Sequence, residues 1–353
     1  MNFDTPLISV LMPIYNSDRY LRQSFDSLIQ QTYKNFEVLC INDGSTDGSG
    51  ETIREYCAID ERFRLIDKEN TGYGSSMNRG IVEAQGDYIA ILEPDDFFRS
   101  NALELFIRPV KSLDETIDIV KANYWFYWSA PNEKRQLITV VPPEKAQCLV
   151  DPQKDPSLYL AIPSVWSALY RKDFLMENKI AFLETPGASF QDLSFTFKTY
   201  AFARSVYLID DPVLSYRQDN EASSVNDPKK AVCIFKELEE IDRTLETLPN
   251  KETIRHYVYR IKYDNYMWNF QRLSKDLRKS FFDHMKQDLM EGMQRGDYKP
   301  SLFYSWQNKN LELVLSRPTT FLKSFPSNPG KISKAWYYLR LGGPKMLIDA
   351  LKR

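Results

Sequence analysis

Three apolar runs near the N-terminus each end in polar, turn-forming residues, and this feature constrains the fold most. Runs of Val, Ile and Leu that alternate with helix-period segments are typical of a parallel sheet covered on both faces. Ligands bind to such sheets beyond the carboxyl ends of the strands. We therefore expect an α/β fold with a ligand site at these ends. The runs cover residues 7–14, 36–41 and 87–92, and they lead into Tyr15-Asn16, Asn42-Asp43 and Glu93-Pro-Asp-Asp96.

The segments between and after these runs predict further elements. Leu21, Phe25, Leu28 and Ile29 recur at helical spacing and form one apolar face that we expect to pack on the sheet. Later segments rich in β-branched and aromatic residues predict strands. These extended segments are residues 117–127, 136–141, 166–170 and 205–216, and a helix is expected over 192–203.

The pattern changes near residue 225. From about residue 227, apolar residues such as Ile234, Leu238 and Ile241 keep helical spacing, and no strand pattern appears. We predict two domains, a catalytic α/β domain over residues 1–225 and a helical region over residues 226–353, whose role we relate to the acceptor or to a membrane.

Composition limits the classes of function. A net charge of −2 over 353 residues argues against nucleic acid as an obligatory partner. The four cysteines lack metal-ligand spacing, and Cys40 lies in an apolar strand where a reduced thiol is expected. Neither a signal peptide nor an apolar run of about 18 residues is evident. We therefore expect a cytoplasmic chain that does not span a membrane.

Several short motifs, taken in order, resemble the family 2 glycosyltransferases, which have the GT-A nucleotide-sugar fold. The resemblance is dense over roughly the first 100 residues and continues thinly to about residue 225. It implies a Rossmann-like GT-A domain, although the dinucleotide fingerprint Gly-x-Gly-x-x-Gly is absent from the sequence. The motifs are Pro13-Ile-Tyr-Asn16, Asn42-Asp-Gly-Ser-Thr-Asp47, Glu69-Asn-Thr-Gly72, Asn78-Arg-Gly80, Gly86-Asp-Tyr-Ile89 and Glu93-Pro-Asp-Asp96.

The resemblance assigns the first motifs to a nucleotide-sugar donor, which we expect to be a UDP-sugar. Pro13, Tyr15 and Asn16 would line the base pocket, and Asp43 would accept a hydrogen bond from the base. Taken alone, Asn16 and Asp43 would equally suit a turn and a helix cap.

Two later motifs belong to the same donor site by resemblance. Gly72 lies in the loop Asn70-Thr-Gly-Tyr-Gly74, whose glycines are expected where the backbone approaches a nucleotide, and Asn78 follows in the next helix. For Tyr73, a plain loop before a helix remains an equal alternative.

The segment Glu93-Pro94-Asp95 occupies the position of the family's Asp-x-Asp signature. By resemblance, Glu93 would bind the ribose and Asp95 would coordinate a divalent metal that bridges the diphosphate. Oxygen ligands beside phosphate suit Mg²⁺ or Mn²⁺. Asp96 is the alternative ligand, and either aspartate could cap the following helix; we favour Asp95 as the ligand.

Inverting transfer requires a general base for the acceptor hydroxyl. Gln191-Asp192 is similar to the family's Glu-Asp pair, whose Asp is the base, although Asp192 would also make a good helix N-cap. Arg217, in the segment 216–224, resembles an arginine that serves the diphosphate; a solvated strand-end arginine is the alternative. Trp166 resembles an aromatic residue near the acceptor, and a core tryptophan is its alternative.

The resemblance implies an inverting glycosyltransferase that forms a β-linked product from an α-linked UDP-hexose, with a glycan, protein-linked or lipid-linked acceptor in polysaccharide biosynthesis. A nucleotidyltransferase would need a basic, glycine-rich loop early in the chain, and Ser17-Asp-Arg19 offers one basic residue. An inactive nucleotide-sugar-binding scaffold would be expected to lose Asp95 or Asp192, and both are present.

Residues 331–353 combine aromatic and aliphatic residues with lysines and arginines. This composition suits an anionic membrane surface, and a helix packed on the protein with its basic face in solvent is the alternative. We expect weak, salt-sensitive contact with the inner face of the membrane, with Trp336, Tyr337 and Tyr338 at the headgroup level.

Overall fold

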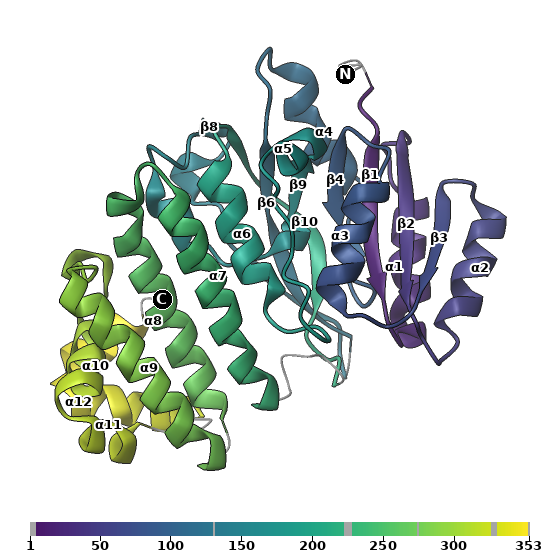
Figure 1. Ribbon diagram of the computed structural model, residues 1–353. Helices are drawn as coiled ribbons and strands as arrows, with labels where there is room; N and C mark the ends of the chain where they lie inside the picture. Colours follow the sequence, from purple (N-terminus) through teal and green to yellow (C-terminus); the bar gives the residue numbers. More distant parts are fainter. Residues whose placement is uncertain (1–4, 130, 222–227, 274, 326–329, 352–353) are drawn as a thin grey trace. The chain divides into compact units, whose positions relative to one another are not determined.

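The computed structural model describes residues 5–129, 131–221, 228–273, 275–325 and 330–351. The chain separates into two compact units, residues 1–223 and 224–353. Within the described residues, every strand belongs to the first unit, and the second unit consists of helices and their connections (Figure 1).

The first unit is built on a ten-stranded mixed sheet. Its strand order is β3-β2-β1-β4-β9-β6-β10-β5, with β7 paired to β6 and β8 paired to β10. The strands are β1 (Ile8–Ile14), β2 (Phe36–Asp43), β3 (Phe63–Lys68), β4 (Tyr88–Ile91), β5 (Phe97–Phe98), β6 (Ile119–Trp128), β7 (Lys134–Ile138), β8 (Cys148–Val150), β9 (Ala168–Arg171) and β10 (Val206–Arg217).

The expectation of a parallel sheet holds for one part of it. Strands β1 to β4 pair in parallel, as do β6 and β10. Strand β9 runs antiparallel to both β4 and β6, and it lies between them. The sheet is therefore mixed, because an antiparallel strand can join the edge of a parallel group without a helical crossover.

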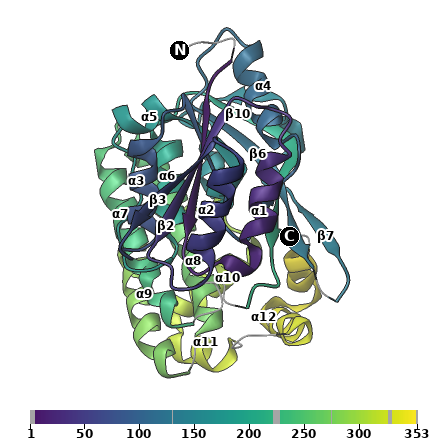
Figure 2. The ribbon, with the colours of Figure 1, turned by 90° about the vertical axis from the view of Figure 1, so that its right-hand side faces the viewer.

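Helices cover both faces of the sheet, as predicted for the α/β class. On one face, Phe25 of α1 joins the same buried cluster as Val10 of β1. On the other face, Gly80 of α3 lies against the side chain of Leu11. Figure 2 shows α1 beside α2. The helices of this unit are α1 (Asp18–Ile29), α2 (Ser49–Ile59), α3 (Tyr73–Glu83), α4 (Ala102–Ser112), α5 (Lys172–Glu177) and α6 (Gln191–Phe202), with the short 3-10 helices η1 (Pro143–Lys145), η2 (Pro156–Leu160) and η3 (Val165–Ser167).

The second unit is a set of helices with an aromatic core. Helix α8 packs against α7 and α9, and α10 packs against α11 and α12. Phe270, Phe282 and Phe321 lie with their rings 5.6 to 6.0 Å apart in its interior. The helices are α7 (Ile234–Thr247), α8 (Lys251–Arg272), α9 (Lys275–Arg295), α10 (Ser305–Ser316), α11 (Pro318–Ser324) and α12 (Lys331–Leu351), with η5 (Pro228–Cys233) and η6 (Pro300–Leu302).

Helix α12 corrects one expectation about the C-terminal segment. Trp336 is 60% exposed, but Tyr337 is buried, and its ring lies 5.1 Å from that of Phe325. The Tyr338 ring lies 5.3 Å from that of Trp306. Two of the three aromatic residues expected at a membrane surface therefore pack within the unit. Residues 352 and 353 lie outside the described residues.

Two glycines, Gly342 and Gly343, interrupt the helical backbone of α12. Among the helices described, none combines the length and the hydrophobicity needed to cross a bilayer.

Candidate active site

Acidic side chains gather where β4 ends and α6 begins. The Tyr73 hydroxyl donates a 2.7 Å hydrogen bond to Oε1 of Glu93. Burial raises the pKa of Glu93 to about 8, the Tyr73 hydrogen bond opposes this shift, and the charges of Asp95 and Asp192 add to it. Glu93 therefore lies within electrostatic range of both the predicted metal ligand and the predicted base.

The two consecutive aspartates after Glu93 have different environments. Asp96 is fully buried: Oδ1 accepts a 2.8 Å hydrogen bond from the Arg217 amide, while Oδ2 has no hydrogen-bond partner in the structure. Burial, followed by the charge of Asp95, raises the pKa of Asp96 well above its usual range. Asp95 keeps partial solvent exposure, and Oδ2 accepts a 2.8 Å hydrogen bond from Asn220. The geometry favours Asp95 over Asp96 as a cation ligand.

A divalent cation fits this arrangement only together with a donor. Among the described residues, no group of three or more His, Cys, Asp or Glu side chains is placed to hold a metal ion. Mg²⁺ is usually held by one or two carboxylates together with substrate phosphates, and Asp95 offers one partly exposed carboxylate of this kind.

Arg217 is buried, so the alternative of a solvated strand-end arginine is wrong. Its Nε donates a 2.9 Å hydrogen bond to the Asp95 carbonyl, and its guanidinium carbon lies 4.5 Å from the ring centre of Tyr20 and 5.1 Å from that of Tyr127. An ion pair of 3.5 Å joins it to Asp219. Arg217 therefore stabilises the turn that carries Asp95 and Asp96, and its predicted contact with the diphosphate stays a prediction. Residues 222–224 of its motif lie outside the described residues.

Asp43 lies at the end of β2 and orders the loop that follows β3. Its Oδ1 accepts a 3.0 Å hydrogen bond from the Thr71 amide, and its Oδ2 accepts one of 3.0 Å from the Gly72 amide. The ammonium of Lys68 also pairs with it. The carboxylate is thus engaged within the chain, and a contact with a nucleotide base would add to these bonds.

The end of β1 is tied to the loop after β2. Asn16, with a left-handed φ of 48°, accepts a 2.8 Å hydrogen bond from the Thr46 amide through Oδ1. Its own amide donates to Ser45 Oγ at 3.1 Å. Tyr15 is 50% exposed beside it, whereas Pro13 is buried within β1. Of these three predicted base-pocket residues, Tyr15 and Asn16 are exposed and Pro13 is buried.

Asn78 serves the fold in this structure. Its Oδ1 accepts a 2.8 Å hydrogen bond from the Phe182 amide, and its Nδ2 donates at 3.0 Å to the Phe182 carbonyl and to Glu184. Asn78 thereby joins helix α3 to the segment that leads towards α6. Its side-chain hydrogen bonds are made within the chain, and its role in the donor site stays a prediction.

The glycines at the start of α3 are needed for a contact within the chain. Gly72 has a φ of 95°, and a Cβ at this position would lie 2.8 Å from the Gly187 amide nitrogen and 2.8 Å from the Thr185 carbonyl oxygen. A Cβ at Gly74 would overlap the Leu183 carbonyl. These glycines therefore allow the chain's own segment 183–187 to pack closely here, and the approach of the backbone to a nucleotide stays a prediction.

Asp192 is the second residue of α6, so its alternative role as N-cap is wrong. The N-cap is Phe190, with a left-handed φ of 63°. Burial raises the pKa of Asp192 to about 7, against the opposing effects of the amides of Asp192 and Leu193 and of the Lys121 charge. A carboxylate with this pKa can accept a proton near neutral pH.

Lys121 of β6 is a site residue that sequence reasoning missed. It is buried, and its ammonium donates to the carbonyl and, at 2.8 Å, to the hydroxyl of Ser164. Burial lowers the pKa of Lys121 to about 7, and Asp192 opposes this shift. In the sequence, the one indication of this site residue is a lysine within the apolar segment 117–127.

Trp166 lies in η3 and precedes β9, although a strand was expected to begin there. Its ring stacks on that of Tyr216 with 4.8 Å between centroids, and it keeps partial exposure. The short helix η3 contacts both β6 and α6, the elements that carry Lys121 and Asp192. Trp166 is therefore neither a strand residue nor a fully buried core residue.

Comparison with known proteins assigns the fold to a family. Residues 9–178 match the model of Glycosyl transferase family 2. This part of the chain is a family 2 glycosyltransferase domain. The chain is 32% identical over 220 residues to the putative glycosyltransferase EpsH of Bacillus subtilis, an alignment that covers 61% of each protein. It is 30% identical over 222 residues to the uncharacterized glycosyltransferase EpsJ of the same organism, covering 61% of this chain and 62% of that one. The alignments thus span less than two thirds of these family relatives.

A solved structure shares the fold of this chain. The structure of S. aureus TarS 1-349 in complex with UDP-GlcNAc aligns with a TM-score of 0.67 and 17% sequence identity, over 95% of this chain and 92% of that one. The likeness confirms the GT-A type of fold.

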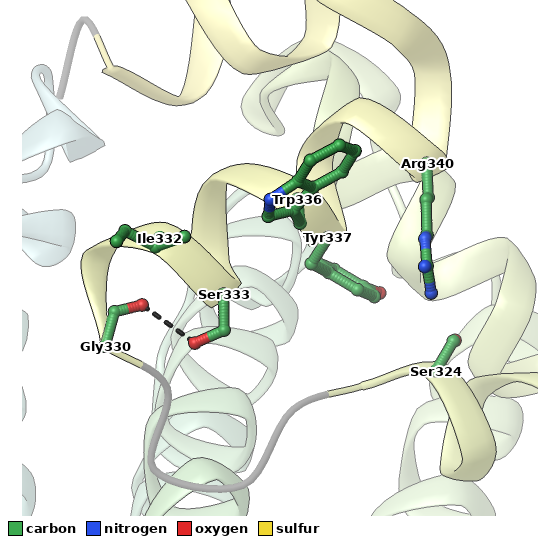
Figure 3. A pocket seen from close by; sticks show the side chains of 7 residues that line it. All are labelled: Ser324, Gly330, Ile332, Ser333, Trp336, Tyr337 and Arg340. Carbon is green, nitrogen blue, oxygen red and sulfur yellow. Dashed lines mark hydrogen bonds between the residues drawn. The ribbon is translucent and has the colours of Figure 1, made fainter.

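The second unit contains a cavity of about 550 Å³ beside α12 (Figure 3). Trp336, Tyr337 and Arg340 line one part of it, and Ser333 Oγ donates a 3.0 Å hydrogen bond to the Gly330 carbonyl at another part. None of the predicted catalytic or donor-binding residues lines this cavity.

Proposed function

We propose that this protein is an inverting glycosyltransferase that moves a sugar from a nucleotide donor to a glycan or glycoconjugate acceptor. The observation that carries the proposal is the environment of Asp192 at the start of α6. Asp192 follows the N-cap Phe190 by two positions, and burial raises the pKa of its carboxyl group to about 7, which suits a general base.

In the proposed reaction, Asp192 accepts the proton of the acceptor hydroxyl. The hydroxyl oxygen attacks the anomeric carbon of the donor from the side opposite the diphosphate, and the bond from that carbon to the diphosphate oxygen breaks. Configuration inverts, so an α-linked donor gives a β-linked product. Trp166 would lie against the acceptor sugar beside this base.

The donor would bind along the strand ends. Tyr15 supplies exposed aromatic surface for the base, and Asp43 keeps the loop of Gly72 in place. Glu93 would accept a hydrogen bond from the ribose. Mg²⁺ or Mn²⁺ at Asp95 would offset the charge of the diphosphate as it leaves.

The test is a panel of nucleotide sugars incubated with the protein and Mn²⁺. UDP-GlcNAc, the ligand of the TarS structure, is the first donor to test. We expect metal-dependent release of nucleoside diphosphate from one donor. Release of pyrophosphate from a nucleoside triphosphate would instead indicate a nucleotidyltransferase, and donor binding without release would indicate an inactive scaffold.

We further propose that α12 makes weak contact with the anionic inner face of a membrane, where lipid-linked acceptors would be presented. Ile332 and Trp336 are 77% and 60% exposed, and Lys334 and Arg340 are also exposed on this helix. Apolar side chains with neighbouring cations are attracted to anionic headgroups.

Liposome co-sedimentation tests this contact. The double variant Ile332→Ser, Trp336→Ser should pellet less than the wild-type protein with anionic vesicles at low salt. Ile59→Ser, which changes an equally exposed residue of α2, should pellet normally. Equal pelleting of all three proteins would exclude α12 as the contact.

A further inference from the structure

Four aromatic side chains form a row that begins at the predicted acceptor residue. The ring of Trp166 stacks on that of Tyr216 at 4.8 Å. The Tyr216 ring lies 5.9 Å from that of Phe126, which lies 6.1 Å from that of Trp128. The row thus runs from η3 across β10 and along β6 without interruption.

The row lies at the surface. All four side chains are partly exposed, including Phe126, Trp166 and Tyr216, which also pack against the hydrophobic core. Phe126 and Trp128 alternate along β6 with Trp125 and Tyr127, so the two pairs lie on opposite faces of the strand. A row of aromatic rings left partly exposed on one face in this way is suited to a ligand.

Polar groups flank the outer half of the row. Strand β7 pairs with this part of β6, where Gln136 lies opposite Phe126 and Lys134 lies opposite Trp128. Both β7 side chains are exposed, and the Lys134 ammonium is 5.0 Å from the ring centre of Trp128. The row therefore offers flat apolar surface with hydrogen-bond donors at its edge.

This combination matches a glycan chain. A pyranose presents flat patches of C–H groups that pack on aromatic rings, and its hydroxyls need polar partners at the rim of the ring. An apolar chain would leave Lys134 and Gln136 without a role. The inner end of the row is at η3, which contacts α6, so the terminal sugar of a bound glycan would lie towards Asp192.

We propose that Trp166, Tyr216, Phe126 and Trp128 form an extended acceptor subsite for a glycan of more than one sugar residue. The proposal rests on the proposed function, since the chain bound along the row is the acceptor. The sugar nearest Trp166 receives the transferred residue, and Phe126 and Trp128 hold the sugars behind it.

Binding to a glycan array tests the subsite without requiring turnover. The array carries mono- to hexasaccharides of glucose, galactose, N-acetylglucosamine and N-acetylgalactosamine. We expect the wild-type protein to bind oligosaccharides of at least one series more tightly than the monosaccharide. Trp128→Ala should weaken oligosaccharide binding about tenfold, as the loss of one aromatic anchor does in other interfaces, and leave monosaccharide binding unchanged.

Two variants control for folding. Trp125→Ala removes a tryptophan of similar exposure from the opposite face of β6 and should bind like the wild type. Trp128→Phe keeps an aromatic ring and should restore most of the binding. Donor hydrolysis without acceptor, measured as nucleoside diphosphate release, should be equal in the wild type and Trp125→Ala, and it reports on the proposed function separately.

Absence of any length dependence in the wild-type protein, including absence of binding to every oligosaccharide of the array, would overturn the subsite even if the donor is hydrolysed. Equal losses in Trp128→Ala and Trp125→Ala would also overturn it.

Discussion

The backbone amide of Arg217 donates a 2.8 Å hydrogen bond to the carboxylate of Asp96, 121 positions earlier in the chain. This bond joins the end of β10 to the turn after β4. The bond keeps the Asp96 side chain buried. Of the two aspartates, only Asp95 is partly exposed to solvent. The turn therefore buries one carboxylate and leaves the other partly exposed.

Asp95→Ala should weaken UDP binding in the presence of Mn²⁺ by roughly tenfold or more, because the diphosphate loses the cation that offsets its charge. Asp96→Asn should keep this affinity. Calorimetry with UDP and Mn²⁺ measures both. Unchanged affinity in Asp95→Ala would move the metal assignment to Asp96.

Asp192→Asn should reduce sugar transfer by about 10² to 10⁴-fold while donor binding and the melting temperature stay close to wild type. The residue lies inside the first turn of α6 and is not its N-cap, and an amide oxygen can still accept from the backbone amides of residues 192 and 193, so a neutral isostere removes the base with little change to the helix. Transfer rates under saturating donor decide the matter, and an active Asn variant would exclude Asp192 as the base.

The pH profile of transfer should depend on Lys121. Asp192 acts as a base when deprotonated, so kcat/KM should rise with pH through about 7. Among the described residues, its charge interacts with those of Lys121, Glu93, Tyr73, Tyr124, Tyr170 and Tyr216.

Lys121→Met removes the one cation in this set, so the ionised carboxylate loses stabilisation, and the rising limb should move up by roughly half a unit to one unit. Lys198→Met, which removes a buried lysine of α6 that donates to the Ala181 carbonyl, is the matched control. Identical profiles for both variants and the wild type would mean that Lys121 does not act on the base.

Glu93→Gln should stabilise the protein at alkaline pH. The folded state raises the pKa of Glu93 from 4.5 to about 8, so the folded protein binds this proton more tightly than the unfolded chain. The stability linked to this proton is full below about pH 4.5 and is lost as the pH rises towards 8.

Gln cannot ionise and can still accept the Tyr73 hydrogen bond. Thermal unfolding should show little difference between Glu93→Gln and wild type at pH 5 and a gain on the order of a few kcal/mol at pH 8.5. Glu55→Gln, which changes an exposed carboxylate paired with Arg22, should show no such trend. A gain that is equal at both pH values would indicate packing as its cause.

The strand ends could be predicted from sequence because an apolar run and the polar residues after it are neighbours in the chain. Asp43 and Asp95 were found in this way, and both lie where the strands end. The hydrogen-bond partners of each side chain could not be predicted, because they are distant in the sequence. Phe182, the partner of Asn78, is 104 positions away. Lys121 was missed because a single lysine in a strand makes no pattern.

Capping also depends on backbone angles that sequence rules do not fix. Asp192 has the side chain of a good cap, yet the left-handed Phe190 begins the helix two residues earlier. Likewise, the burial of Tyr337 depends on Phe325, which belongs to a different part of the helical unit.

The fit of Gly72 and Gly74 against residues 183–187 limits how this chain can be recombined with its relatives. The matched family region ends at residue 178, whereas Asp192 lies beyond it. A chimera that takes everything after residue 178 from a relative would place a different backbone against these two glycines and would shift the predicted base with it. Crossover points after α6 keep this contact within one parent, so laboratory shuffling should recover folded hybrids mainly with junctions there.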